Sequence, residues 1–118
     1  MKHVLTAVAS VMFAATAFAA APKAAPKSVT LKGEIVDTVC YLTKGAHGAG
    51  HKACAQACIK GGTPASLLAD GKLYLLVAGH GNAAAMDQVK AHAGDTVTVT
   101  GQEASKDGLS AIIVASVK

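Results

Sequence analysis

The feature that most constrains the fold of this chain is the order of five short segments in which apolar and polar residues alternate. Such alternation is typical of strands with one buried face. The predicted strands cover residues 29–41, 65–69, 72–78, 95–103 and 109–117, and a helical pattern covers residues 83–92. The turn signals Asp70-Gly71 and Lys106-Asp107-Gly108 join two pairs of strands into hairpins. This β-β-β-α-β-β order is that of the five-stranded OB barrel.

Glycines inside the first and fourth predicted strands, Gly33 and Gly101, suit strands that bend around the corners of a barrel. A further helix is predicted after the first strand. It follows a glycine- and histidine-rich loop over residues 44–51 and runs to Lys60, where Gly61-Gly62 end it. We therefore expect a mainly β fold, a small OB-like barrel with a cysteine-bearing helix inserted after strand 1 and a second helix between strands 3 and 4.

The N-terminal region is predicted to be an export signal. Residues 1–19 combine a short basic start, an uncharged apolar run and the small-x-small site Ala17-Phe18-Ala19. The run is too short and too rich in alanine for a membrane anchor, so we expect a periplasmic or secreted protein without a membrane span after cleavage. Residues 20–28 repeat Ala-Pro-Lys and predict a disordered leader. Residues 29–118 then form a single small domain.

The composition argues against nucleic-acid binding and against catalysis. All eleven basic residues are lysines, against seven acidic residues, and Tyr41 and Tyr74 are the only aromatic residues after the signal. Proteins that bind single strands use aromatic stacking platforms and usually arginine. No Ser-His-Asp order, phosphate loop or dinucleotide fingerprint is present either, so we expect no enzyme activity.

The three cysteines and one histidine predict a metal site. His51, Cys54 and Cys58 stand at i, i+3 and i+7, which places them on one stripe of a helix, and Cys40 precedes them. The helix dipole near its first turn favours thiolate and neutral imidazole, the forms that bind metals. Three thiols and one imidazole suit zinc or copper(I), with the imidazole favouring zinc. We predict a Cys3His site formed by Cys40, His51, Cys54 and Cys58.

Two other interpretations of the cysteines remain open. A disulfide from Cys40 to Cys54 or Cys58 would stabilise a domain with so small a hydrophobic core by roughly 3 kcal/mol. Alternatively, the thiols are inert core residues. His47 is an alternative or fifth ligand, or else a mobile loop residue. His80 either approaches the mouth of the barrel or lies in a solvated turn.

The cysteine segment also carries a resemblance. The pattern Asp37-x-x-Cys40-Tyr41, Gly48-x-x-His51-x-x-Cys54-Ala55-x-x-Cys58 and Gly62-x-Pro64 resembles that of small exported bacterial proteins of largely uncharacterised function. These are often predicted as OB-like domains with a cysteine–histidine cluster after the first strand, and the similarity covers most of residues 33–117. The resemblance implies a metal or redox site and names no substrate.

The expected function is therefore that of an exported metal-binding protein. Its site would be structural or would handle metal in the cell envelope, with an envelope protein as a candidate partner. The alternative is a disulfide-stapled OB-like module that binds a protein or small ligand on its barrel face.

Overall fold

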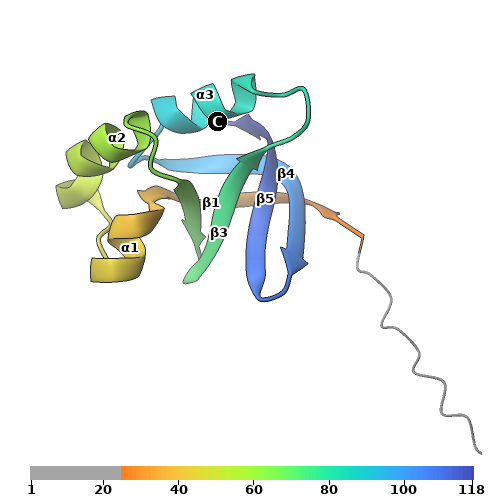
Figure 1. Cartoon of the computed structure of the whole chain (residues 1–118), viewed down its shortest axis with the longest axis horizontal. Helices are drawn as coiled ribbons and strands as arrows, with labels where there is room; N and C mark the ends of the chain where they lie inside the picture. The colour runs from red at the N-terminus through yellow and green to blue at the C-terminus, as the bar shows by residue number, and fades with distance from the viewer. Residues whose placement is uncertain (1–24) are drawn as a thin grey trace, which may run out of the picture.

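Five strands close into a barrel in the computed structural model, which describes residues 25–118. The strands are β1 (Lys27–Asp37), β2 (Ala65–Ala69), β3 (Lys72–Ala78), β4 (Thr96–Lys106) and β5 (Leu109–Val117). Their order around the barrel is β1-β2-β3-β5-β4, and β4 pairs with β1 (Figure 1). Neighbouring strands are antiparallel except β3 and β5, which run parallel. The prediction of a small, mainly β, OB-like barrel is confirmed at this level.

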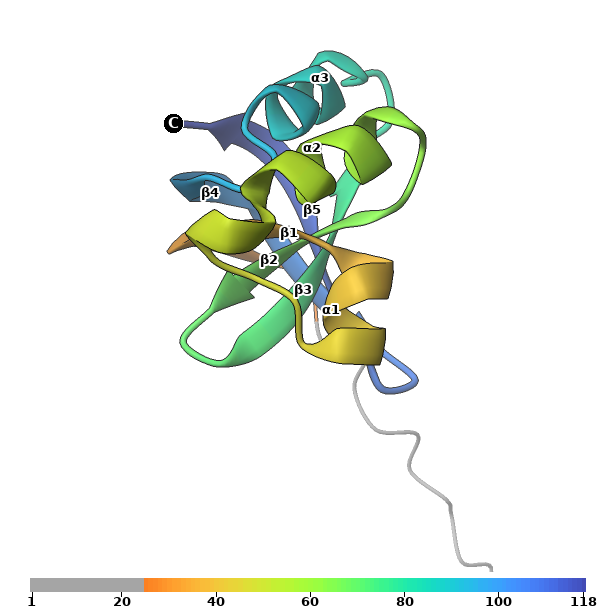
Figure 2. The same ribbon diagram turned by 90° about the vertical axis from the view of Figure 1, so that its left-hand side faces the viewer.

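The helices lie at one end and along one flank of the barrel. Between β1 and β2 come α1 (Thr38–Lys44), the 3-10 helix η1 (Ala49–His51) and α2 (Lys52–Lys60), and α3 (Ala84–Ala91) lies between β3 and β4. Figures 1 and 2 show α3 across one end of the barrel and α1 with α2 along the flank. Apolar side chains of α2 and α3 are buried, namely Ala55, Ile59, Ala85 and Val89, whereas α1 has no buried residue. The core therefore extends under α2 and α3 but not under α1.

The glycines within the strands lie where two chain segments approach closely. A β-bulge falls between Thr100 and Gly101 of β4. A Cβ atom at Gly101 would collide with the carbonyl oxygen of Ile113, and one at Gly33 would collide with that of Leu68. The missing side chains let β4 and β1 approach their neighbours closely as the barrel closes, and the bulge bends β5, which carries the extra residue Ala115.

The structure corrects the end of the first strand and the insertion that follows. We predicted a strand to Tyr41 because Thr38 and Val39 extend the alternation, but β1 ends at Asp37 and residues 38–44 form α1. The Asp37 side chain accepts a hydrogen bond from the Cys40 amide at 2.7 Å and caps the helix. Gly45, in the left-handed conformation with φ 65°, ends it. Two strong capping residues thus outweigh the β-branched pair between them.

The loop predicted over residues 44–51 is shorter than expected. Lys44 belongs to α1 and residues 49–51 form η1, so only residues 45–48 remain irregular. The insertion accordingly contains two α-helices rather than one.

The barrel also begins earlier than predicted. Lys27 and Ser28, assigned to the leader, pair with Glu103 and Gln102 of β4. The predicted signal over residues 1–19 and the first part of the leader, residues 20–24, lie outside the described residues.

Candidate metal centre

The insertion between β1 and β2 begins and ends beside two residues that pair with each other across these strands. Asp37, the last residue of β1, pairs with Ala65, the first residue of β2. The Thr38 amide donates to the Pro64 carbonyl at 3.0 Å, and the Thr38 and Ser66 hydroxyls lie 2.7 Å apart in a hydrogen bond. These contacts hold the start of α1 and the end of α2 on the same flank, which faces the viewer in Figure 2.

Three potential ligand atoms meet at this junction. A carboxylate oxygen of Asp37 and the sulfur atoms of Cys40 and Cys58 all lie within 4.8 Å of one another. Cys40 lies in the first turn of α1, and Cys58 lies in the last turn of α2, where its carbonyl accepts from the Thr63 amide at 3.0 Å. A tetrahedral zinc ion with zinc–sulfur distances of about 2.3 Å separates two sulfur atoms by about 3.8 Å. Small side-chain rotations would therefore let this group hold a metal ion.

The Asp37 carboxylate has an unsatisfied oxygen. The side chain is fully buried, and its Oδ1 accepts from the Cys40 amide. Its Oδ2 is also buried and has no hydrogen-bond partner among residues 25–118. A buried polar group without a partner costs about 1–3 kcal/mol, and more when it is charged. A cation bound beside the two thiols would satisfy this oxygen.

The electrostatics of the thiols reflect the same crowding of acidic groups. Partial burial raises the pKa of the Cys40 thiol, and the Asp37 carboxylate and Cys54 raise it further. Partial burial, followed by Cys54 and Asp37, raises the pKa of the Cys58 thiol to about 11. Each neighbour is a group whose negative charge opposes a thiolate. A bound cation would reverse this balance and favour the deprotonated, ligating form.

The structure brings together two of the four predicted ligands. Cys40 and Cys58 belong to the group with Asp37, while His51 and Cys54 do not. Cys54 is exposed and lies one turn before Cys58 in α2. His51 lies in η1, and its Nε2 is buried without a hydrogen-bond partner in the described part of the chain. The complete Cys3His set therefore stays a prediction.

Asp37 is the candidate ligand that sequence reasoning missed. The predicted first strand, residues 29–41, includes it, and the predicted ligand set did not. A signal was nonetheless present, since Asp37-x-x-Cys40 followed by Gly45 has the spacing of a capped short helix. A cap that accepts from the amide of Cys40 necessarily places its carboxylate near that residue.

The two other candidate histidines lie on the surface. His47 is exposed in the loop after α1, and its ring stacks on that of Tyr41 with centroids 5.9 Å apart. His80 is exposed in the turn that follows β3. Neither belongs to the Asp37–Cys40–Cys58 group.

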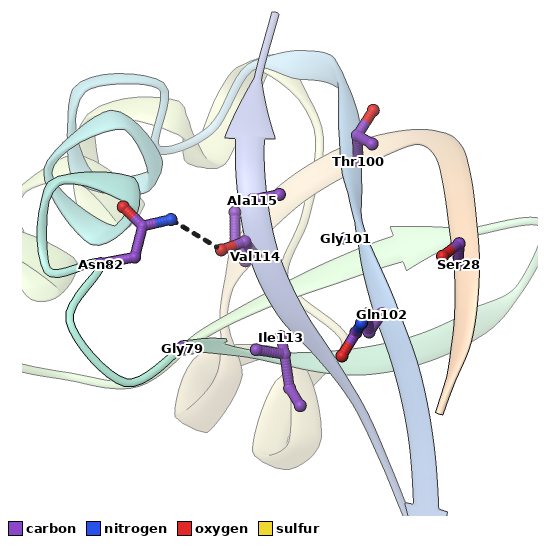
Figure 3. Close-up of a pocket in the computed structure, with 9 residues that line it drawn as sticks. All are labelled: Ser28, Gly79, Asn82, Thr100, Gly101, Gln102, Ile113, Val114 and Ala115. Carbon is purple, nitrogen blue, oxygen red and sulfur yellow. Dashed lines mark hydrogen bonds between the residues drawn. The ribbon is translucent and has the colours of Figure 1, made fainter. Parts of the chain in front are cut away.

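Two further hollows lie on the barrel surface. One, of about 360 Å³, is lined by uncharged residues of β1, β4, β5 and the β3–α3 connection, where the Asn82 amide donates to the Val114 carbonyl at 3.4 Å (Figure 3). The other, of about 420 Å³, lies beside α1 and is lined by Leu42 and Leu109 among others. Neither contains a cysteine, histidine or carboxylate side chain, so the candidate metal centre is separate from both.

Comparison with known proteins gives no relative from which a function could be transferred. No family model, no curated protein and no solved structure matches the chain. Among residues 25–118, no helix has the length and apolar character needed to cross a membrane.

Proposed function

We propose that this protein binds a thiophilic metal ion, zinc or copper(I), through Asp37, Cys40 and Cys58, with a fourth position open to an additional ligand. The observation that carries the proposal is the fully buried Asp37 carboxylate grouped with two thiol sulfurs, whose Oδ2 has no hydrogen-bond partner within bonding distance among residues 25–118. Buried charges in proteins are normally paired or coordinate metals. Two thiols and a carboxylate at one point form a donor set that suits a thiophilic metal ion.

The donor set favours zinc over copper(I). Zinc accepts carboxylate oxygen as well as thiolate sulfur, whereas copper(I) is selected by soft sulfur ligands alone. A copper(I) site would therefore leave Asp37 outside and recruit Cys54 to Cys40 and Cys58. His51, with its buried and unpartnered Nε2, is the other candidate for the fourth position in a zinc site.

Cobalt(II) substitution of the purified, reduced chain tests the proposal. Cobalt(II) adopts the coordination of zinc and gives sulfur-to-metal charge-transfer bands whose intensity grows with the number of thiolates. We expect one ion per chain and bands that weaken in Cys40→Ser and Cys58→Ser. Asp37→Asn should retain the charge-transfer bands and lower the affinity by about 10–100-fold. Absence of binding by cobalt(II), zinc and copper(I) would refute the proposal.

The proposed setting is the periplasm or the extracellular space. This part rests on the signal-like residues 1–19 and on the resemblance to small exported bacterial proteins, and an envelope protein remains the proposed partner. Mass determination of the protein after expression in a bacterial host tests it. Cleavage after Ala19 and recovery from the periplasmic fraction are expected, and an intact N-terminus in the cytoplasm would contradict export.

A second candidate function follows from the distance between the thiols. The sulfur atoms of Cys40 and Cys58 lie within 4.8 Å of each other, close enough for a disulfide after a modest rearrangement. In an oxidising compartment this bond would staple the insertion and leave an OB-like module for ligand binding. Intact-mass analysis with and without thiol alkylation distinguishes the two states, since a disulfide leaves only Cys54 to be alkylated.

A further inference from the structure

The candidate metal centre lies outside the hydrophobic core. The core is formed by strand residues such as Ile35, Leu67 and Ile112 and by Ile59 and Val89 of the helices, and none of the proposed ligands belongs to it. Structural zinc sites instead supply folding energy to domains that lack a sufficient core. The core of the barrel therefore forms without a contribution from the proposed ligands, so an ion bound there can exchange without disrupting the core.

The thiols and the carboxylate form a gradient of exposure across this centre. Asp37 is fully buried, Cys40 and Cys58 are half-buried, and Cys54 is exposed. Cys54 and Cys58 stand at i and i+4 in α2, which places their side chains next to each other on one helix face. An ion that arrives from solvent meets Cys54 first and Asp37 last.

We propose, on the basis of the metal site proposed above, that Cys54 is the exchange thiol, through which the metal ion is received from an external thiolate complex. The Cys54 sulfur attacks the carried ion, a bond forms between this sulfur and the metal, and one metal–sulfur bond to the carrier breaks. The proton of Cys54 passes to the released carrier thiolate. The ion then moves to Cys40, Cys58 and Asp37. Each new bond from the sulfur of Cys40 or Cys58 replaces a metal–sulfur bond to the carrier or to Cys54, the protons of Cys40 and Cys58 pass to the thiolates released, and no redox change occurs.

The partner of this reaction is a molecule that presents metal on thiolates, such as a small thiol or a cysteine-bearing protein. Ligand exchange between thiolates requires an accessible attacking sulfur, because the incoming ligand must reach the metal before the old bond breaks. Cys54 is the one exposed cysteine of the three. Cys40 and Cys58, half-buried on α1 and α2, retain the ion once Cys54 has delivered it.

Stopped-flow transfer of zinc from a glutathione–zinc complex tests this role. The reduced full chain is compared with Cys54→Ser, with Cys58→Ser as a variant that lacks a resident ligand, and with Ala53→Ser as a matched control. Ala53 is exposed on the same helix, so serine there adds a hydroxyl without removing a thiol. The equilibrium affinity of each protein is measured separately by competition with a chromophoric chelator.

We expect Cys54→Ser to slow transfer by at least about tenfold. Its equilibrium affinity for the metal should change by no more than the roughly 10–100-fold that residues outside the set of metal ligands contribute. Ala53→Ser should transfer like the wild type, and Cys58→Ser should lose affinity. If Cys54→Ser transfers at the wild-type rate, the exchange role is wrong and the metal site stands. If Cys54→Ser loses as much affinity as Cys58→Ser, Cys54 is a resident ligand, and the exchange role is again overturned. If the wild type binds no metal, the proposed function fails as well.

Discussion

Replacement of Asp37 by asparagine should have opposite effects on stability in the absence and presence of metal. Asparagine caps a helix as well as aspartate does, so the bond from the Cys40 amide is retained. The substitution removes the buried oxygen that has no partner in the described chain. A buried oxygen without a partner destabilises the folded state by about 1–3 kcal/mol. The asparagine amide avoids part of this penalty by donating weak hydrogen bonds to the nearby sulfur atoms. We expect the metal-free variant to be about 1 kcal/mol more stable than the wild type, which raises Tm by about 4–8 °C.

With metal present, the order of the two proteins should reverse. An ion at 100 times its Kd stabilises the native state by about 2.7 kcal/mol. Loss of the carboxylate ligand lowers affinity by about 10–100-fold, which at the same metal concentration removes roughly 1.3–2.3 kcal/mol of that stabilisation. Under the same metal concentration, the Asp37→Asn variant should then melt below the wild type.

Thermal unfolding followed by circular dichroism, with added zinc or with a chelator, measures both differences. Asp37→Ala is the control, because it removes the cap together with the carboxylate and should be about 1 kcal/mol less stable than Asp37→Asn without metal. Should asparagine lower Tm by the same amount in both conditions, the Asp37 carboxylate acts in packing alone. The argument from its unpartnered oxygen would then be refuted.

Three further predictions concern the thiols and the barrel. Chelation should lower the Tm of protein purified with its metal while a reductant alone leaves it unchanged, and the reverse pattern would indicate a disulfide. Because folding raises the pKa of Cys58 from 9.0 to about 11, the metal-free native state keeps this proton to higher pH than the unfolded chain does. Urea titrations should therefore show a contribution to stability that is complete below pH 9 and falls between pH 9 and 11. Metal affinity should instead rise with pH, since binding releases thiol protons, and flat profiles would contradict both expectations. Gly101→Ala should destabilise by more than about 2 kcal/mol because the new Cβ meets the Ile113 carbonyl, whereas Gly50→Ala, which enters open space, should change stability by less than about 1 kcal/mol.

The fold was largely predictable because its signals are local. Alternation of apolar residues predicted the β2–β3 hairpin and the full extent of β5, and the Asp-Gly pairs predicted the turns that join the hairpins. The helix after β3 followed from its composition. The error at Thr38–Lys44 arose because two β-branched residues continue the strand pattern, while the decisive contributions come from the cap at Asp37 and from Gly45.

For the candidate site, the sequence predicted less, and the tertiary structure was needed to show which residues lie together. The amino-acid sequence by itself determined that cysteines recur on one face of a helix, because helical periodicity is a local property. That Cys40 and Cys58, separated by two helices and a loop, share a site with Asp37 depends on the pairing of Asp37 with Ala65 at the closing rung of the insertion. The Asp37 carboxylate is fully buried at this pairing, which no local pattern in the sequence indicates. The pairing of Asp37 with Ala65 joins residues on either side of a long insertion, and for this reason only the tertiary structure decided which residues form the candidate metal centre.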